Sequence, residues 1–127
     1  MEWHSVKVIH GFRNGRKFGF PTANLSGESI KSINVGVYAV IVRYNDILYK
    51  GMLYVGTRPT LNLIKTTYEI HILNFCGDIY GKNLDFKVIR HLRNECRFDS
   101  IHQLIQQLEL DLRNTDLYVK LPKSQKQ

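Results

Sequence analysis

The chain has 127 residues, of which 43% are hydrophobic and 23% are charged. These values fit one globular domain over residues 1–127, with a core that needs no disulfides. No apolar stretch approaches the ~20 residues of a membrane-spanning helix, so we expect no membrane partner. Eighteen Lys and Arg residues against eleven Asp and Glu give a net charge of +7. Such an excess favours polyanionic ligands, either nucleic acid or nucleotide phosphates.

The distribution of basic residues and of cysteines along the chain narrows the possible ligands and cellular compartments. The basic residues are scattered along the chain, whereas nucleic-acid binders more often show a basic stripe interleaved with aromatic residues. We therefore expect no nucleic-acid partner. The two cysteines, Cys76 and Cys96, have no metal-ligand spacing and indicate free thiols in a reducing compartment. We expect a cytoplasmic protein.

Short segments rich in β-branched and aromatic residues indicate strands over the first two thirds of the chain. We expect strands at 6–10, 36–44, 47–55, 66–75 and 84–92. Asn45-Asp46 predicts a tight hairpin turn between two of them. Gly51 indicates a bulge or a close backbone approach. Two long loops, at 11–34 and 56–65, remain between the strands, and loops of this length are more often functional than accidental.

The hydrophobic period then changes from two to that of a helix. The apolar positions that repeat with helical spacing are Ile101, Leu104, Ile105, Leu108 and Leu112. They predict an amphipathic helix that either Asp99 or Ser100 caps, and Ser100 with Gln103 fits a capping box. Residues 121–127 are expected to form a frayed tail. Short strands followed by one terminal helix predict a mainly β fold, a small antiparallel barrel with the helix on its outside or at its mouth.

The segment 11–24 contains the groups that phosphate chemistry needs. Its glycines allow backbone N–H groups to approach a phosphate closely, and Arg16 and Lys17 supply positive charge. Thr22 and Asn24 supply hard oxygen ligands suited to Mg²⁺. Each feature alone is common, because most glycine-rich segments are plain loops and most Thr and Asn residues of this kind cap turns. The chemistry therefore indicates a phosphate-and-magnesium loop and leaves the substrate open.

The same segment resembles the hallmark of the riboflavin kinase family, a glycine-rich loop that ends in Gly-x-Pro-Thr-Ala-Asn. Here it reads Gly19-Phe20-Pro21-Thr22-Ala23-Asn24. The resemblance continues in order across residues 6–111. The further matching segments are Gly36-Val37-Tyr38, Gly56-Thr57-Arg58-Pro59-Thr60, Glu69-Ile70-His71-Ile72-Leu73 with Tyr80-Gly81, and Leu92-Arg93 with Phe98-Asp99-Ser100.

The resemblance implies a Greek-key barrel of about six antiparallel strands with a C-terminal α-helix. It also implies ATP-dependent phosphorylation of riboflavin to FMN. The likeness is to the carboxy-terminal kinase module of the bacterial bifunctional enzyme that makes FMN and then FAD. Such enzymes carry a covalently linked amino-terminal adenylyltransferase module, so this chain is expected to be an excised domain.

Carried over residue by residue, the resemblance implies the following roles. Glu69 is the general base that takes the proton from the ribityl 5′-hydroxyl, and Thr22 and Asn24 hold Mg²⁺ on the phosphates of ATP. The positions expected to contact ATP are Gly11, Arg16, Lys17, Ile72, Asn74 and Tyr80. The positions expected to contact the flavin are Arg93, Cys96 and Phe98.

The chain departs from the family pattern at four places. Val6 stands where the family usually has Gly, and Glu2-Trp3 replaces the residues that usually lead into the first strand. Asn94 replaces Pro. Asn74 replaces His or Asp, and Cys96 stands where some relatives have Lys. The departures at Val6 and Cys96 motivate an alternative hypothesis, a non-catalytic flavin-nucleotide module of a larger FAD synthetase. A third hypothesis, a nucleic-acid-binding barrel, rests on the net charge alone.

Overall fold

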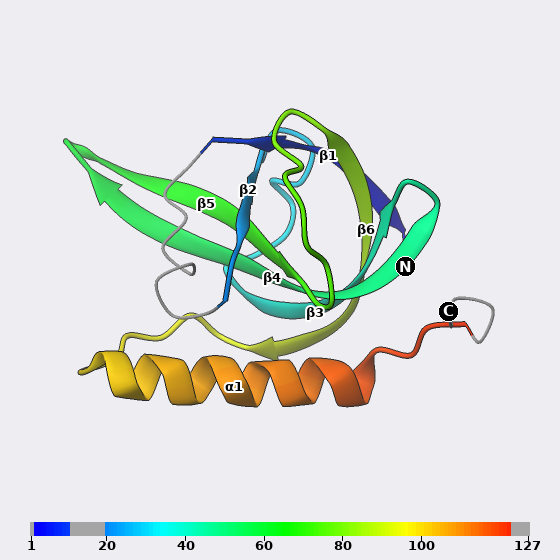
Figure 1. Cartoon of the computed structure of the whole chain (residues 1–127). Helices are drawn as coiled ribbons and strands as arrows, with labels where there is room; N and C mark the ends of the chain where they lie inside the picture. Colours follow the sequence, from blue (N-terminus) through cyan, green and yellow to red (C-terminus); the bar gives the residue numbers. More distant parts are fainter. Residues whose placement is uncertain (1, 11–19, 123–127) are drawn as a thin grey trace.

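Six strands and one helix make up the part of the chain that the computed structural model describes, residues 2–10 and 20–122 (Figure 1). The elements are β1 (Trp3–Ile9), β2 (Ala23–Leu25), β3 (Gly36–Tyr44), β4 (Ile47–Thr60), β5 (Leu63–Ile72), β6 (Asn83–Arg93) and α1 (Ile101–Tyr118).

The strands close into one barrel in the order β1-β2-β5-β4-β3-β6, and every neighbouring pair is antiparallel. Strands β3, β4 and β5 follow one another as hairpins, and β6 then returns to lie beside β3, which is the Greek-key arrangement. Because the ring is closed, the barrel presents no free sheet edge along its paired segments. The predicted Greek-key barrel of about six strands with a C-terminal helix is confirmed.

Strand β2 was not predicted, because residues 11–34 were assigned entirely to a loop. This assignment is wrong for Ala23–Leu25. The three residues pair with β1 through Val8↔Leu25 and with β5 through Asn24↔Glu69. A strand of three residues that follows a proline carries too little periodicity to be recognised alone. Its partners in β1 and β5 define it, and it completes the barrel.

The predicted loop at 56–65 is also wrong. Strand β4 continues to Thr60, β5 begins at Leu63, and the two form a long hairpin that projects from the barrel (Figure 1). Gly56 and Pro59 indicate a loop by propensity, but a two-stranded extension has an open edge that tolerates both residue types. The overlooked signal is Asn62, which takes a φ of 66° in the two-residue connection.

The other local expectations about turns are confirmed. Asn45 and Asp46 take φ values of 50° and 64°, as a type I′ hairpin turn requires. At Gly51, a Cβ would lie 2.8 Å from Cγ2 of Val42 and 3.2 Å from the carbonyl oxygen of His71. The glycine therefore permits a close approach inside the barrel.

Alternating side chains fill the barrel interior. Tyr68, Ile70 and Ile72 of β5 point into the core, as their period of two predicts, and so do Leu84 and Phe86 of β6. Full burial of one such aliphatic or aromatic side chain contributes about 1.5–3 kcal/mol. The core therefore fixes which face of β5 looks inward and places Glu69, between two inward residues, on the outer face.

Helix α1 packs against β3, β4 and β6 beneath the barrel (Figure 1). Its N-cap is Ser100, whose Oγ accepts the backbone N–H of Gln103 at 3.1 Å, as predicted. The predicted apolar stripe is only partly correct, because Ile101 is 61% exposed. Leu108 of the stripe is buried and Leu104, Ile105 and Leu112 are half-buried, while the buried positions also include Asp111 and Thr115. No helix in the described part of the chain is long and apolar enough to cross a membrane.

Candidate active site

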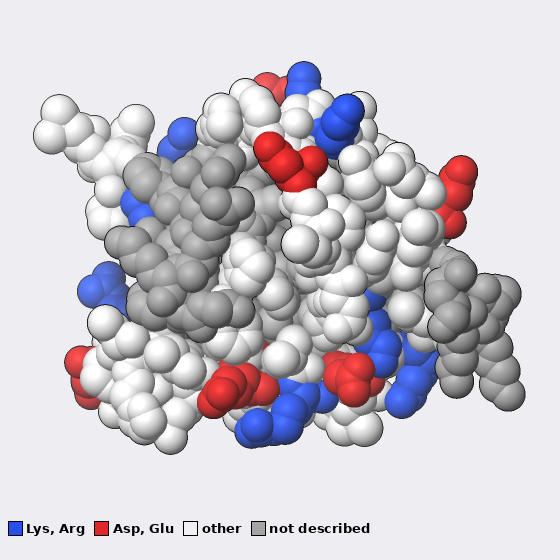
Figure 2. Space-filling model, in the orientation of Figure 1, with Lys and Arg blue, Asp and Glu red and all other residues white. Residues whose placement is uncertain are grey.

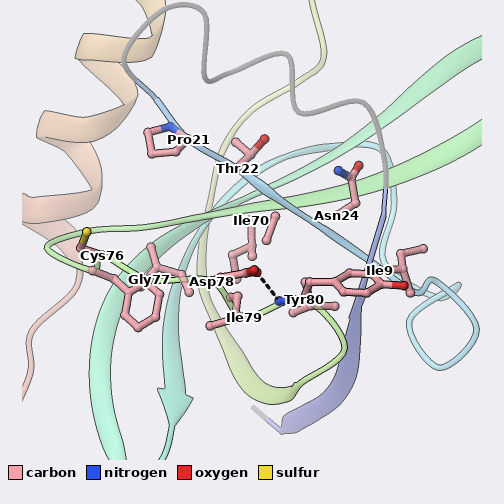
Figure 3. Close-up of a pocket in the computed structure, with 14 residues that line it drawn as sticks. Ile9, Pro21, Thr22, Asn24, Ile70, Cys76, Gly77, Asp78, Ile79 and Tyr80 are labelled. Atoms are coloured by element: carbon pink, nitrogen blue, oxygen red, sulfur yellow. Dashed lines mark hydrogen bonds between the residues drawn. The ribbon is translucent and has the colours of Figure 1, made fainter.

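One cavity lies beside β2, and we call it the β2 cavity. It has a volume of about 320 Å³ and separates β2 from the connection between β5 and β6 (Figure 3). Its described lining residues are Val8, Ile9, Pro21, Thr22, Ala23, Asn24, Ile70, Ile72, Phe75, Cys76, Gly77, Asp78, Ile79 and Tyr80. Apolar side chains therefore share this cavity with polar ones, namely Thr22 and Asn24 on the β2 side and Asp78 and Tyr80 on the β5–β6 connection.

A second cavity, the α1 cavity, has a volume of about 290 Å³ and lies between β4, the segment after β6 and α1. Its described lining residues are Phe20, Thr22, Gly36, Val37, Tyr54, Val55, Gly56, Thr57, Arg58, Thr67, Glu69, Arg93, Glu95, Cys96, Phe98, Leu104 and Leu108. Aromatic and aliphatic groups dominate the wall, and Glu69 and Arg93 are among its charged members. This is the composition of a site for a flat organic ligand with a few polar anchors.

Thr22 lines both cavities. Its Oγ1 donates a hydrogen bond to Oε1 of Glu69 at 2.8 Å, across the pairing of β2 with β5. Because Asn24 is the direct partner of Glu69 in that ladder, the three side chains expected to carry the chemistry meet at one place. The two cavities therefore share Thr22, whose hydroxyl is bonded to the carboxylate of Glu69 in the wall of the α1 cavity.

The side-chain amide of Asn24 has one atom in this site without a hydrogen-bond partner. The residue is 8% exposed, and its Nδ2 is buried with no hydrogen-bond partner, which costs free energy in a finished structure. Thr22 and Asn24 are two residues apart and so lie on the same side of the chain, and both line the β2 cavity. No group of three His, Cys, Asp or Glu side chains that suits a metal occurs among the described residues.

The nucleotide-contact residues expected from sequence divide into three groups. Ile72 and Tyr80 line the β2 cavity. Asn74 does not appear in its described lining and instead turns the chain with a φ of 58°. The remaining three, Gly11, Arg16 and Lys17, lie outside the described residues.

The connection between β5 and β6 is held by two contacts. Oδ1 of Asp78 accepts the backbone N–H of Tyr80 at 3.0 Å (Figure 3), and the ring of Tyr80 stacks on His10 with centroids 3.5 Å apart. On the opposite wall, Nδ1 of His71 lies 2.7 Å from the carbonyl oxygen of Pro21. One of these contacts is local, and the other two join the β2 cavity's walls to segments distant in sequence.

All three residues expected to contact the flavin line the α1 cavity, namely Arg93, Cys96 and Phe98. The segment that carries them is tied to β4 by Glu95, whose carboxylate accepts the backbone N–H of Thr57 at 2.9 Å and its hydroxyl at 3.0 Å. Gly56 permits this approach, since a Cβ there would lie 2.8 Å from Oε2 of Glu95.

Arg93 is anchored from below by α1. Its Nε and Nη2 donate to the carboxylate of Asp111 at 2.8 to 3.1 Å. Burial works to lower the pKa of Arg93, but the hydrogen bonds and charge of Asp111 outweigh burial and raise it. Burial, and then the charge of Asp111, raises the pKa of the Tyr54 phenol, so this hydroxyl stays neutral at physiological pH.

Sequence reasoning missed three members of this region: Tyr54, Glu95 and Asp111. Tyr54 and Glu95 carry no local signal, because an aromatic residue in a strand and an acidic residue in a loop are ordinary. Asp111 did have one, since it lies three residues after Leu108 and seven after Leu104, on the side of α1 that faces the barrel. A carboxylate at a core-facing helical position indicates a buried partner.

The closed barrel has two cavities that share Thr22, and the hydroxyl of Thr22 is bonded to Glu69. This arrangement suits an enzyme that binds two substrates side by side. Comparison with known proteins makes this specific. The Flavokinase model, described as riboflavin kinase, matches residues 4–119. The chain therefore belongs to the riboflavin kinase family.

Individual relatives agree with the family. The chain is 36% identical over 106 residues to the RNA-binding riboflavin kinase RibR of Bacillus subtilis. The matched region covers 83% of this chain and 46% of that protein. It is 37% identical over 107 residues to the bifunctional riboflavin kinase/FMN adenylyltransferase of Haemophilus influenzae, with coverages of 84% and 35%. The chain thus spans less than half the length of these curated relatives.

Two solved structures share the fold. A protein of Streptococcus pneumoniae described as a macrolide-efflux protein superposes with a TM-score of 0.83 at 32% identity, over 92% of this chain and 39% of that one. Riboflavin kinase from Trypanosoma brucei superposes with a TM-score of 0.65 at 22% identity, over 95% of this chain and 81% of that one. The second likeness is one of fold.

Proposed function

We propose that this chain transfers the terminal phosphoryl group of ATP to the 5′-hydroxyl of riboflavin, giving FMN and ADP. The observation that carries the proposal is the 2.8 Å hydrogen bond from Thr22 to Glu69 where the two cavities meet. Phosphoryl transfer depends mainly on bringing donor and acceptor together and on neutralising charge, and the junction supplies a place for both.

The β2 cavity suits the nucleotide. Apolar residues such as Ile9 and Ile72, with the ring of Tyr80, line this cavity and are suited to a purine ring. The hydroxyl of Thr22 and the amide of Asn24 lie beside Glu69 and are suited to the phosphate end. Gly11, Arg16 and Lys17 remain a proposal from sequence for further phosphate contacts, and Asn74 is proposed to act through its backbone.

We propose that the side-chain oxygens of Thr22 and Asn24 would hold Mg²⁺ at the phosphate end of this cavity. When bound, the cation neutralises phosphate charge and orients the transferred group. The donor set fits, because Mg²⁺ prefers hard oxygens and is commonly held by few protein ligands plus substrate phosphates. The unpartnered Nδ2 of Asn24 is a hydrogen-bond donor, so it suits an acceptor such as a phosphate oxygen and not the cation itself.

The α1 cavity suits the flavin. Val37, Val55 and Leu108 supply apolar wall for an aromatic ring system, and Arg93 and Phe98 close one side. Cys96 is proposed to contribute at the rim. The ribityl chain would then point toward the junction, where Glu69 is half-buried and faces this cavity.

Glu69 is proposed to act as the general base. Its carboxylate accepts the proton of the 5′-hydroxyl as the oxygen attacks phosphorus, and the bond to the leaving ADP oxygen breaks. Thr22 holds one carboxylate oxygen, Oε1, by hydrogen bonding, which leaves Oε2 for the incoming hydroxyl. The Thr22–Glu69 pair therefore orients the base toward the flavin side.

Two further proposals concern a linked module and the cellular compartment. The relative from H. influenzae is described as both riboflavin kinase and FMN adenylyltransferase, and we propose that this chain works beside a covalently linked adenylyltransferase module. Cys76 and Cys96 are free and exposed thiols, which supports a reducing compartment, and we propose the cytoplasm.

The test is direct. Purified protein, given Mg²⁺, ATP and riboflavin, is expected to form FMN and ADP in equal amounts, measured by chromatography of the flavins. A folded protein that binds riboflavin and ADP but forms no FMN would instead establish the non-catalytic flavin-nucleotide module.

Nucleic-acid binding is the remaining alternative, motivated by the net charge of +7 and by the RNA-binding description of RibR. On the face shown in Figure 2, Lys and Arg side chains are dispersed, and acidic side chains stand between them along the lower edge, where α1 lies. Strong binding to single strands that weakens steeply with salt, without affinity for riboflavin, would favour this alternative.

A further inference from the structure

A chain of polar side chains runs from α1 to the α1 cavity. Asp111 is 1% exposed, yet it carries a carboxylate. Nε of Arg93 lies 2.9 and 3.1 Å from its two oxygens, and Nη2 lies 2.8 Å from Oδ2. Nε2 of Gln107 donates to Oδ1 at 2.9 Å. Burial of a carboxylate is costly unless it is paired and hydrogen-bonded, and this one is satisfied by two neighbours.

The pairing determines how Arg93 is presented. Asp111 takes the edge of the guanidinium that carries Nε and Nη2. Nη1 is left on the other side, where it lies 3.3 Å from the carbonyl oxygen of Asn94 and 3.4 Å from Sγ of Cys96. The Arg93 Cζ lies 5.8 Å from the ring centroid of Phe98. A planar fork held along one edge keeps a fixed plane, so Arg93 stands as a rigid wall beside Phe98.

The pairing of Arg93 with Asp111 decides whether this wall suits a neutral or an anionic ligand. The positive charge of Arg93 is balanced by Asp111 from behind, and Tyr54 in the same cavity is a neutral phenol. A site with a balanced guanidinium plane, a phenol and a phenyl ring is matched to a flat, uncharged ring system. It is poorly matched to a phosphate, which selects uncompensated cations.

A purely structural role would be simpler, but two observations speak against it. A buried ion pair contributes little net stability, because desolvation offsets the attraction. Furthermore, α1 already has a second ion pair to the barrel, between Lys50 and Asp116 at 2.7 Å, in which the side chain of Asp116 is 71% exposed. Neither of those residues lines the α1 cavity as described.

We propose that Asp111, supported by Gln107, is a positioning residue that fixes Arg93 as one wall of the flavin-ring site. Neither Asp111 nor Gln107 is among the described residues that line the cavity, so both act through Arg93. The inference rests on the proposed function for the identity of the ligand, and it assigns to α1 a role in recognising the flavin.

The experiment compares Asp111→Asn and Gln107→Ala with Asp116→Asn as the matched control on the same helix. FMN affinity is measured by flavin fluorescence, ADP affinity by calorimetry, and folding by thermal denaturation. Asp111→Asn is expected to weaken FMN binding about tenfold, the scale of a lost hydrogen bond to a charged group, with ADP affinity unchanged. Gln107→Ala is expected to show a smaller loss of the same kind, and Asp116→Asn none.

A double-mutant cycle decides between positioning and bulk stability. In an Arg93→Ala background, Asp111→Asn is expected to cause no further loss of FMN affinity, because its partner is gone. Additive losses, equal losses for FMN and ADP, or unchanged FMN affinity in Asp111→Asn would overturn the proposal. If Asp111→Asn fails to fold, a double-mutant cycle of Gln107→Ala with Arg93→Ala distinguishes positioning from bulk stability in the same way.

Wild-type turnover is measured separately from binding. Protein that binds FMN without making it would refute the kinase activity and leave the positioning test valid. Protein that binds ADP but no FMN would overturn the positioning role itself.

Discussion

The two cavities on either side of Thr22 and Glu69 are built in different ways. The described lining of the β2 cavity comes from residues 8–9, 21–24 and parts of 70–80, none of them in α1, and contacts such as Tyr80 with His10 hold its walls. The α1 cavity includes Leu104 and Leu108 of the helix. It also depends on α1 through Arg93, which Asp111 anchors. Nucleotide binding should therefore tolerate changes in α1 that impair flavin binding.

The largest expected effect is at the junction that both cavities share. Glu69→Gln keeps the size of the side chain and removes the base, so kcat is expected to fall about 10²–10⁴-fold. The affinities for ADP and FMN should stay close to those of the wild type, because neither cavity loses a wall. Steady-state kinetics and binding measurements on the same preparation check this, and an undiminished kcat would remove Glu69 from the reaction.

Thr22→Val tests the bond that joins the cavities. The change is nearly isosteric and removes the hydroxyl that donates to Glu69 at 2.8 Å and that is also proposed to hold Mg²⁺. We expect kcat to fall about 10- to 100-fold, in line with a lost hydrogen bond to a charged group. Thr22→Ser is the control and is expected to retain most activity. Equal activity in the Val and Ser variants would show that the hydroxyl is not used.

The two exposed cysteines provide a direct test of the contrast between the cavities. Cys76 lines the β2 cavity and Cys96 lines the α1 cavity. Alkylation of Cys76 is expected to slow several-fold when ADP is bound, whereas alkylation of Cys96 slows when FMN is bound. Peptide mass spectrometry after timed alkylation reads both sites in one sample. The opposite pattern of protection would exchange the two ligand assignments.

The smallest expected effect concerns the barrel that supports both cavities. Asp85 accepts Ser5 Oγ at 2.6 Å and Nη2 of Arg43 at 3.0 Å, and these bonds hold β6 to β1 and β3. The hydrogen bond from Ser5, and then Arg43, hold the pKa of Asp85 below its usual value. Asp85→Asn is expected to cost about 1 kcal/mol of stability at pH 7, a fall of a few degrees in Tm.

The sign of the pH dependence follows from that lowered pKa. The stabilisation by Asp85 is fully present above the unfolded pKa of about 3.9 and is lost as pH falls through the lower folded pKa. The difference in Tm between wild type and Asp85→Asn should therefore shrink in acid, as measured by fluorescence of Trp3 from pH 7 to pH 3. A difference that grows in acid would contradict this assignment.

Much of the barrel was predictable because its signals are local. The alternation at Tyr68, Ile70 and Ile72 fixed the orientation of β5, and Asn45-Asp46 fixed one hairpin. Two expectations failed at places where pairing partners decide the structure, namely β2 and the extended β4–β5 hairpin. Strand β2 gains ladder hydrogen bonds from strands remote in sequence, and the hairpin extension gains them from the strand that follows it. In both cases this pairing outweighs weak local propensity.

The chemistry divides in the same way. The sequence alone determined a phosphate-and-magnesium motif that contains Thr22 and Asn24, and through its resemblance to a family it supplied Glu69 and the flavin positions. Only the tertiary structure decided that Thr22 and Glu69 are hydrogen-bonded where two cavities meet, and that Asp111 holds Arg93. The physical reason is that periodicity and motif spacing report on neighbours along the chain. A buried ion pair or a junction between cavities forms from side chains that only the closed barrel brings together.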